Sequence, residues 1–252
     1  MMTYLLTFSF AVLGAILASF VGVIAERVNT GQSWMHGRSR CNSCAQDLTG
    51  KDLVPVLSYL VSRGRCFACR ARIPVAYVAL ELLLALVFGL AYAALGLTPA
   101  LPVFLLSVLV LAFIVVYDLR HTIVPTSASL TLVSLSFLFA LMEAETIVSF
   151  GLALFIAGLI GSMFFLLFFF SRGRAMGLGD APVALALSLL IAPYAFGGLL
   201  LSFWIGAVYG IAVLVLRRGG PRMGIEVPFV PFLALGYLIA YFAAWNPALI
   251  TL

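Results

Sequence analysis

The stretch IVSFGLALFIAGLIGSMFFLLFFFS, residues 147–171, contains no charged side chain. The hydrocarbon core of a bilayer is about 30 Å thick, and a helix needs roughly 20 consecutive apolar residues to cross it. A run of this length and composition therefore predicts a membrane-spanning helix that begins at Ile147 and ends at Ser171.

The rest of the chain has the same character, since 64% of its 252 residues are hydrophobic and only 9% are charged. Soluble domains carry about 25% charged residues. We therefore expect an all-α integral membrane protein, a polytopic bundle of about eight transmembrane helices. The apolar stretches are Thr3–Ala25, Val75–Leu97, Leu101–Tyr117, Ile123–Met142, Ile147–Ser171, Ala181–Ala195, Leu199–Leu216 and Pro228–Trp245. The sixth is short and contains Pro193, which makes its ends the hardest to predict.

Basic residues fall in alternate loops of this predicted bundle. The 14 Lys and Arg residues follow the first, third, fifth and seventh helices, whereas the other loops and both termini have none. Short cytoplasmic loops collect Lys and Arg, so we expect these loops in the cytoplasm and both termini on the opposite side of the membrane. The net charge of +5 then indicates contact with anionic lipid and not with nucleic acid, for which interleaved stacking aromatics are missing.

The cysteines occur as two C-x-x-C pairs, Cys41 with Cys44 and Cys66 with Cys69, in the polar loop after the first helix. This spacing is typical of a four-cysteine zinc site, in which each pair supplies two thiolates to a tetrahedron. Two disulfides or a redox pair are the alternatives, but disulfides rarely persist in the cytoplasm and no βαβ pattern surrounds either pair. Four cysteines close the coordination sphere, so we expect a structural zinc that holds this loop together.

Three acidic residues lie near membrane depth: Glu81, Asp118 and Asp180. An acid at the centre of a transmembrane helix costs roughly 2.5–3.5 kcal/mol on insertion scales, so each is a candidate for a function. Asp118 follows the third predicted helix and Asp180 precedes the sixth, which places both at the cytoplasmic face. Glu81, inside the second helix, is expected either to pair with a loop arginine or to border a polar pocket.

Asp118 and Asp180 are expected to meet and to act as a catalytic pair. Two carboxylates that face each other across a water do not both ionise readily, so one serves as base and the other as acid, as in aspartyl proteases. Gly177 and Gly179 would let a substrate backbone approach closely, and His121 is either an assistant to the pair or a surface residue. Alternatively, Asp118 pairs with Arg120 or caps a helix, and Asp180 is an N-cap or first-turn acid.

A series of motifs in one order resembles the bacterial prepilin peptidases, the type IV leader peptidases and N-methyltransferases of the GxGD aspartyl protease class. The motifs are ASFVGVIAERV (18–28), RSRCNSCAQDL (38–48), LSYLVSRGRCFACRARI (57–73), YVALE (77–81), YDLRHTIVP (117–125), GLGD (177–180) and VPFVPFLALG (227–236). The resemblance covers nearly the whole chain. It departs from the family pattern at Gly22, Val78, Thr126 and Pro182.

The resemblance implies that Asp118 and Asp180 are the catalytic aspartates and that the four cysteines are zinc ligands. It implies an aspartic endopeptidase of the bacterial inner membrane, which cuts the leader of type IV prepilins or pseudopilins on the cytoplasmic side and serves type IV pili or type II secretion. It also implies methylation of the new N-terminus from S-adenosylmethionine. Residues 1–98 would then be the methyltransferase-associated region with the cysteine loop, and residues 99–252 the peptidase domain.

Other classes of protein compete with this interpretation. A proton-coupled transporter with a structural zinc loop would also use intramembrane acids, but it normally holds them near the midplane between repeated halves, and no internal repeat is visible. A zinc-loop scaffold would need no aspartates. A preflagellin peptidase of the archaeal type is related, but those enzymes typically lack the cysteine loop.

Overall fold

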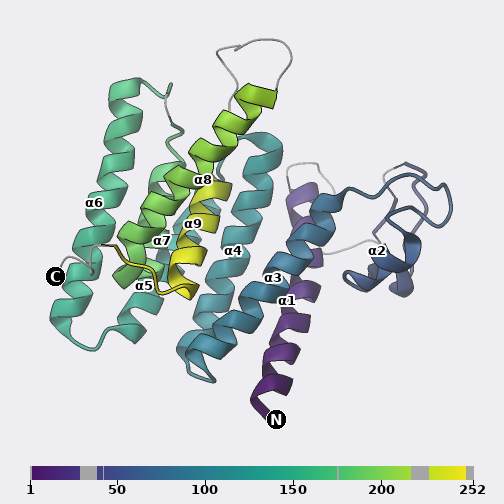
Figure 1. The fold of residues 1–252 in the computed structure, drawn as a ribbon, viewed down its shortest axis with the longest axis horizontal. Coiled ribbons are helices and arrows are strands. Elements are labelled where there is room, and N and C mark those ends of the chain that lie inside the picture. Colours follow the sequence, from purple (N-terminus) through teal and green to yellow (C-terminus); the bar gives the residue numbers. More distant parts are fainter. Residues whose placement is uncertain (1, 29–38, 42, 175, 217–226, 248–252) are drawn as a thin grey trace. The chain divides into compact units, whose positions relative to one another are not determined.

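The structure, a computed structural model, describes residues 2–28, 39–41, 43–174, 176–216 and 227–247. Within these ranges the chain is helical, and its only β-structure is two isolated bridges. The helices, drawn in Figure 1, are α1 (Met2–Arg27), η1 (Gly50–Leu53), α2 (Leu57–Ser62), α3 (Val75–Leu95), α4 (Ala100–His121), α5 (Thr126–Glu143), α6 (Ile147–Ser171), α7 (Asp180–Leu190), η2 (Ala192–Tyr194), α8 (Ala195–Leu216) and α9 (Val230–Phe242).

The expected polytopic all-α membrane architecture is confirmed. In the described part of the chain, six helical segments are long and apolar enough to cross a membrane: α1, α3, α4, α5, α6 and η2 with α8. The other two predicted stretches form the shorter apolar helices α7 and α9. The expected number of about eight spans therefore holds only approximately.

Pro193 sets the end of the sixth predicted stretch. Helix α7 stops at Leu190 instead of continuing to Ala195, because Ile191 leaves the helical region with φ −126° and ψ 36°. Proline has no N–H to donate and its ring clashes with the preceding turn. Pro193 accordingly lies in the short 3₁₀ segment η2, and α8 begins at Ala195 and not at Leu199.

The chain divides into two compact units, residues 1–101 and residues 102–252. In the first unit α1 packs along α3. Gly14 makes this contact possible, because a Cβ at residue 14 would lie only 2.9 Å from Cβ of Phe88. Nearer the start of α1, the rings of Phe10 and Tyr92 stack with centroids 5.0 Å apart. The cysteine loop, residues 39–74, lies between the two helices in the sequence.

Helix α7 is the centre of the second unit. It packs against α5, α6, α8 and α9, and nine of its residues are buried, including Asp180 and Ser188. A helix that is apolar on every side is stable only when other elements surround it. The buried hydroxyl groups of Ser188 and Tyr237, 2.9 Å apart, satisfy each other between α7 and α9. This packing holds the N-terminus of α7 in a defined place.

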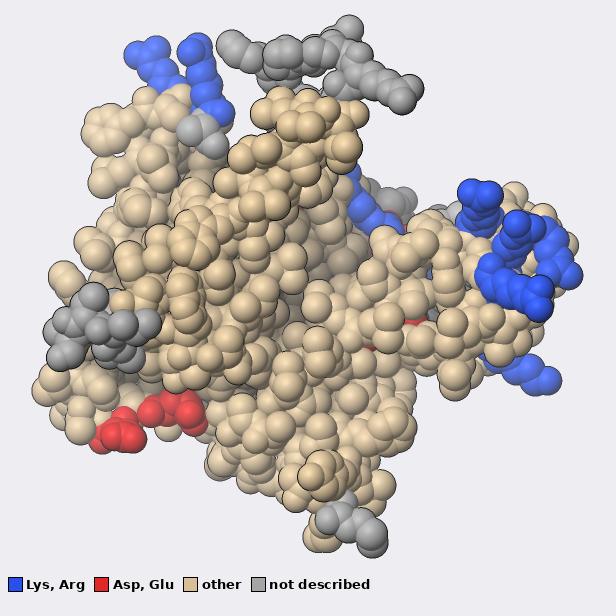
Figure 2. Space-filling model, viewed as in Figure 1, with Lys and Arg blue, Asp and Glu red and all other residues tan. Residues whose placement is uncertain are grey.

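In the second unit, basic and acidic side chains lie at opposite ends of α6. Figure 2 shows basic side chains beyond the end of α6, where Arg172 and Arg174 follow the helix, and acidic ones at its start, where Glu143 and Glu145 precede it. This separation has the pattern on which the predicted orientation depends. Four further residues of the predicted basic loops, Arg38, Arg217, Arg218 and Arg222, lie outside the described residues.

Candidate active site and metal site

Asp118 and Asp180 come from the ends of two helices of the second unit. Asp118 lies in the last turn of α4, which continues to His121 and not only to Tyr117, and Asp180 is the first residue of α7. Both are buried, with exposed fractions of 5% and 7%. Their carboxyl groups are close enough for electrostatic repulsion between the charged forms. The structure therefore brings the two acids together.

The start of α9 faces the same pair of acids. The backbone N–H of Val230, the first residue of α9, is directed at the Asp118 carboxyl group. The N–H groups in the first turn of a helix have no acceptor within the helix, and the helix dipole favours negative charge there. The N-termini of α7 and α9 thus both favour a negative charge at this point. The sequence did not reveal the role of Val230, because a backbone donor has no side-chain signature. Pro231 is typical of a helix start and was the only sign in the sequence that a helix begins here.

One oxygen of the pair has no hydrogen-bond partner among the described residues. Asp118 Oδ2 is buried and accepts no hydrogen bond from any described residue. A buried oxygen without a partner costs about 1–3 kcal/mol, so it is an available acceptor for a proton or for a water molecule. Because the two carboxyl groups repel each other when both are charged, one can stay protonated and act as an acid while the other acts as a base. The unpartnered oxygen can hold the water molecule between them.

Gly179 lets the two aspartates approach each other. A Cβ at residue 179 would lie 2.5 Å from Cβ of Val124, which follows Asp118 in the chain. The absent side chain therefore brings the segment before α7 against the segment after α4. At Gly177 a Cβ would make only an ordinary contact, 3.5 Å from Asp180 Oδ2. Its backbone N–H donates to that oxygen at 3.1 Å, which orients the Asp180 carboxyl group.

The remaining candidates near the pair have different surroundings. His121 is exposed, and its ring lies 4.4 Å from that of Tyr117 between centroids. The N-cap residue of α7 is Gly179, so Asp180 is a first-turn acid and not an N-cap. Because Asp180 is also buried beside a second carboxyl group, the helix start alone does not account for it.

The two C-x-x-C pairs form turns of the same design, residues 40–47 and 65–72, which we call the knuckles. In each, the N–H of the first cysteine donates to the carbonyl oxygen five residues later at 2.9 Å, and the N–H four residues later donates back to the cysteine carbonyl, at 2.9 Å in the first knuckle and 3.0 Å in the second. The residues at this fourth position, Ala45 and Arg70, have φ of 57° and 60°. An isolated β-bridge closes each knuckle.

The knuckles bring four sulfur atoms together. The Sγ atoms of Cys41, Cys44, Cys66 and Cys69 all lie within 4.8 Å of one another, and those of Cys41 and Cys69 are 3.8 Å apart. Four sulfurs bound to zinc at about 2.3 Å in a tetrahedron are about 3.8 Å apart. All four thiols are free, so the disulfide alternative is wrong, and the cluster fits one metal ion.

Hydrogen bonds in the first knuckle favour a thiolate. The backbone N–H groups of Cys44 and then Ser43 donate toward Cys41 Sγ, and together with neighbouring thiols they lower the pKa of Cys41 to about 6. At Cys69 the backbone N–H of Ala71 acts in the same direction, but desolvation and the other sulfurs outweigh it and raise the pKa to about 11. Mutual repulsion of this kind is what a bound cation relieves.

Glu81 joins the cysteine loop to the helices of the first unit. It is buried in α3, and its Oε2 accepts the backbone N–H of Val56 at 2.7 Å. The hydroxyl of Ser19 in α1 also interacts with its carboxyl group. Val56 has φ 62°, a strained value for a β-branched residue. Glu81 also lines a cavity together with residues of both knuckles, and among the described residues it forms no ion pair with an arginine.

Comparisons with known proteins agree with these features. Residues 12–95 match the family described as Bacterial Peptidase A24 N-terminal domain, and residues 103–211 match the Type IV leader peptidase family. A curated relative from Bacillus subtilis (strain 168), named prepilin leader peptidase/N-methyltransferase, is 30% identical over 91% of this chain and 91% of its own length. Relatives of the same name from Aeromonas salmonicida (strain A449) and Myxococcus xanthus (strain DK1622) are 31% and 35% identical, over 81% and 84% of this chain and 70% and 64% of their own lengths. No solved structure matches the chain. The identity shared with these relatives over most of the sequence shows that the chain belongs to the type IV leader peptidase family.

Proposed function

We propose that this protein is a membrane-embedded aspartic endopeptidase that removes the leader from type IV prepilins or pseudopilins and then methylates the new N-terminus. Family membership supports this activity. The observation that carries it is the buried pair Asp118 and Asp180, which repel each other at the ends of α4 and α7 beside the start of α9.

In the proposed mechanism the two aspartates share one proton and hold one water. The ionised carboxylate takes a proton from this water, which attacks the carbonyl carbon of the scissile peptide bond. The protonated partner donates a hydrogen bond to the developing oxyanion, and the amine leaves with a proton from the pair. The N-termini of α7 and α9 stabilise the negative charge that the pair retains throughout.

The four cysteines hold a structural zinc in this proposal. Zinc saturated by four thiolates has no open position for water or substrate, so the ion stabilises the loop and takes no part in bond cleavage. When bound to the first unit, S-adenosylmethionine supplies the methyl group. The basic residues of the same loop, which Figure 2 shows on its surface, contact anionic lipid.

The proposed location is the bacterial inner membrane, with both termini outside the cytoplasm. The cysteine loop and the aspartate pair then lie at the cytoplasmic face, where the leader of a prepilin is still exposed. The apolar segment of the substrate lies among the helices and presents its cytoplasmic end to the pair. No nucleic acid takes part.

Mass spectrometry of a pilin co-expressed with this protein tests the two activities together. We expect the pilin to lose its leader and to gain the mass of one methyl group at the new N-terminus. A host that lacks the gene provides the control and should retain the full-length prepilin. A pilin that keeps its leader in the presence of the protein would refute the peptidase function. A trimmed but unmethylated pilin would refute only the methyltransferase function.

A further inference from the structure

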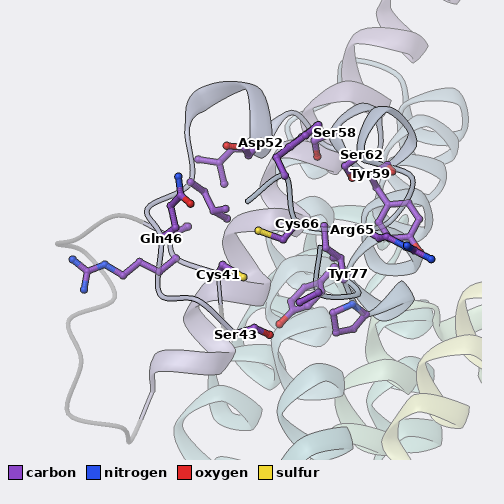
Figure 3. A pocket seen from close by; sticks show the side chains of 18 of the residues that line it. Cys41, Ser43, Gln46, Asp52, Ser58, Tyr59, Ser62, Arg65, Cys66 and Tyr77 are labelled. Carbon is purple, nitrogen blue, oxygen red and sulfur yellow. Dashed lines mark hydrogen bonds between the residues drawn. The ribbon is translucent and has the colours of Figure 1, made fainter. Parts of the chain in front are cut away.

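A cavity of about 270 Å³ lies within the first unit. Its walls come from both knuckles, from the short segments η1 and α2, and from the ends of α1 and α3 that adjoin the loop. Figure 3 shows side chains of this lining, among them Cys41, Cys66 and Tyr77. The cavity belongs to the unit that lacks the aspartate pair, so the peptidase reaction does not account for it.

Glu81 is the buried charge in this cavity. Only 9% of its surface is exposed, and no cationic side chain among the described residues forms an ion pair with it. Its known partners, the Val56 N–H and the Ser19 hydroxyl, are neutral. A buried carboxylate is costly unless a positive charge compensates it. A cationic ligand in the cavity would supply that charge.

The other charged groups that face the cavity do not replace such a ligand. They are Glu26, Arg40, Asp47, Asp52, Arg65 and Arg72. Glu26 and Asp52 are half-buried, and the others are exposed on the loop. Arg40 is bonded to Asp47 at 2.6 Å, and Asp52 accepts the N–H of Thr49 at 2.8 Å. Glu26 is half-buried and accepts the hydroxyl of Tyr77, which adds a second carboxylate to the helix side of the cavity.

We propose that this cavity receives the α-ammonium group of the processed polypeptide and that Glu81 is its counter-ion and proton acceptor. The inference rests on the proposed methyltransferase function. It names the residue that deprotonates the amine to which the methyl group is transferred. An α-ammonium group has an ordinary pKa of about 7.7–8.0, so at neutral pH the amine must lose a proton before its nitrogen can attack.

The proposed methyl transfer needs only the amine, the Glu81 carboxylate and S-adenosylmethionine. The ammonium group gives one proton to the Glu81 carboxylate, and the freed nitrogen lone pair attacks the methyl carbon of S-adenosylmethionine. The N–C bond forms as the C–S bond breaks, and its electron pair stays on sulfur, which leaves as the neutral thioether. The methylated amine carries the positive charge that the sulfonium had, and Glu81 returns its proton to solvent.

The variant Glu81→Gln separates charge from structure. Its amide oxygen still accepts the Val56 N–H, but the side chain takes up no proton. At pH 7 we expect single-turnover methylation to fall about tenfold, because only about a tenth of an amine with this pKa is neutral at pH 7. As the pH rises past about 8, the amine loses its proton to solvent and the variant should recover most of the wild-type rate.

Leader cleavage and bound zinc should be unchanged. The exposed-loop variant Glu145→Gln is the matched control, with normal methylation at every pH.

A binding measurement tests the site without methyl transfer. The probe is a synthetic peptide with the sequence that follows the cleavage site of the pilin substrate, with its amine free or acetylated. The wild-type protein should bind the free amine at least about tenfold more tightly, and Glu81→Gln should lose most of this preference. Equal binding by the wild type, or a methylation loss in Glu81→Gln that is the same at every pH, would overturn the inference. A wild type that prefers the free amine but never methylates would instead refute the methyltransferase function.

Discussion

At the scale of single residues, Gly179 shows how the absence of one side chain shapes the candidate active site. Both aspartates are buried at helix ends, and their mutual position depends on the loop segments beside them. Gly179 and Val124 are in van der Waals contact only because residue 179 has no Cβ. In GLGD, Gly179 therefore allows close packing at the site and Gly177 orients the Asp180 carboxyl group. Both effects are separate from any contact with a substrate backbone.

Gly179→Ala should reduce leader cleavage sharply. The new methyl group would overlap Val124, which lies 2.5 Å from its ideal position, and overpacking of this kind typically costs about 1–3 kcal/mol. We expect a cleavage rate at least about tenfold lower and a lower unfolding midpoint in detergent. The double variant Gly179→Ala with Val124→Ala removes the overlap and should regain part of both.

Gly151→Ala is the matched control for this experiment. It lies in α6 with nothing within 4 Å of the added Cβ, and alanine is the better helix former. Its cleavage rate and unfolding midpoint should equal or slightly exceed those of the wild type. If Gly179→Ala behaves like Gly151→Ala, the contact with Val124 has no part in forming the site.

At the scale of elements, the sequence predicted most where one segment decides its own structure. Helix α6 has the bounds of the uninterrupted apolar run, because such a run can satisfy its backbone in a membrane only as a helix. The cysteine cluster followed from spacing alone, since each C-x-x-C pair closes its own turn. Helix α4 continued through Arg120 and His121, because charged residues at the end of a span reach the interface and remain helical.

Features that depend on distant segments were harder to predict. The expectation that Asp118 and Asp180 meet came from the predicted topology, because nothing in YDLRHTIVP or GLGD alone specifies this contact or the position of the start of α9 beside it. Packing around α7 decides this, and the Val230 N–H leaves no mark in the sequence. For the same reason the sequence could not identify Val56 and Ser19 as the residues that interact with the Glu81 carboxyl group.

The knuckles should bind one zinc ion per chain. The sulfur positions fit a tetrahedral site, so metal analysis of the purified protein should find one equivalent, and Cys66→Ser should lose it. Without the ion the loop has few apolar contacts, so limited proteolysis should cut between residues 39 and 73 much faster. Ser43→Ala, which alters a non-ligand side chain in the first knuckle, should keep the zinc and resist the protease. Cys66→Ser with a full equivalent of zinc would contradict the site.

At the scale of the whole molecule, the alternation of basic and acidic ends predicts the orientation in the membrane. Alkaline phosphatase fused after Gly96, which follows α3, or after Glu145, which follows α5, should be active if these sites lie outside the cytoplasm as proposed. Fusions after Lys51, in the cysteine loop, or Gly173, after α6, should be inactive. The reverse pattern of activities would place the cysteine loop and the aspartates on the wrong side for cutting a cytoplasmic leader.

The two compact units divide the proposed chemistry between them. Residues 102–252 contain the aspartate pair, whereas the knuckles, Glu81 and the cavity belong to residues 1–101. Substitutions in one unit should therefore affect one reaction more than the other, and Glu81→Gln is designed to show this separation.

The cleavage of a purified prepilin by Asp118→Asn and Asp180→Asn tests the central claim most directly. Asparagine keeps the size of the side chain but cannot exchange a proton, so each single variant should lose at least about 1,000-fold in rate, because the pair acts as a unit. Glu145→Gln, which removes an exposed acid of the same unit, should cleave at the wild-type rate. Cleavage near the wild-type rate by either aspartate variant, with normal folding, would contradict the assignment of Asp118 and Asp180 as the catalytic pair.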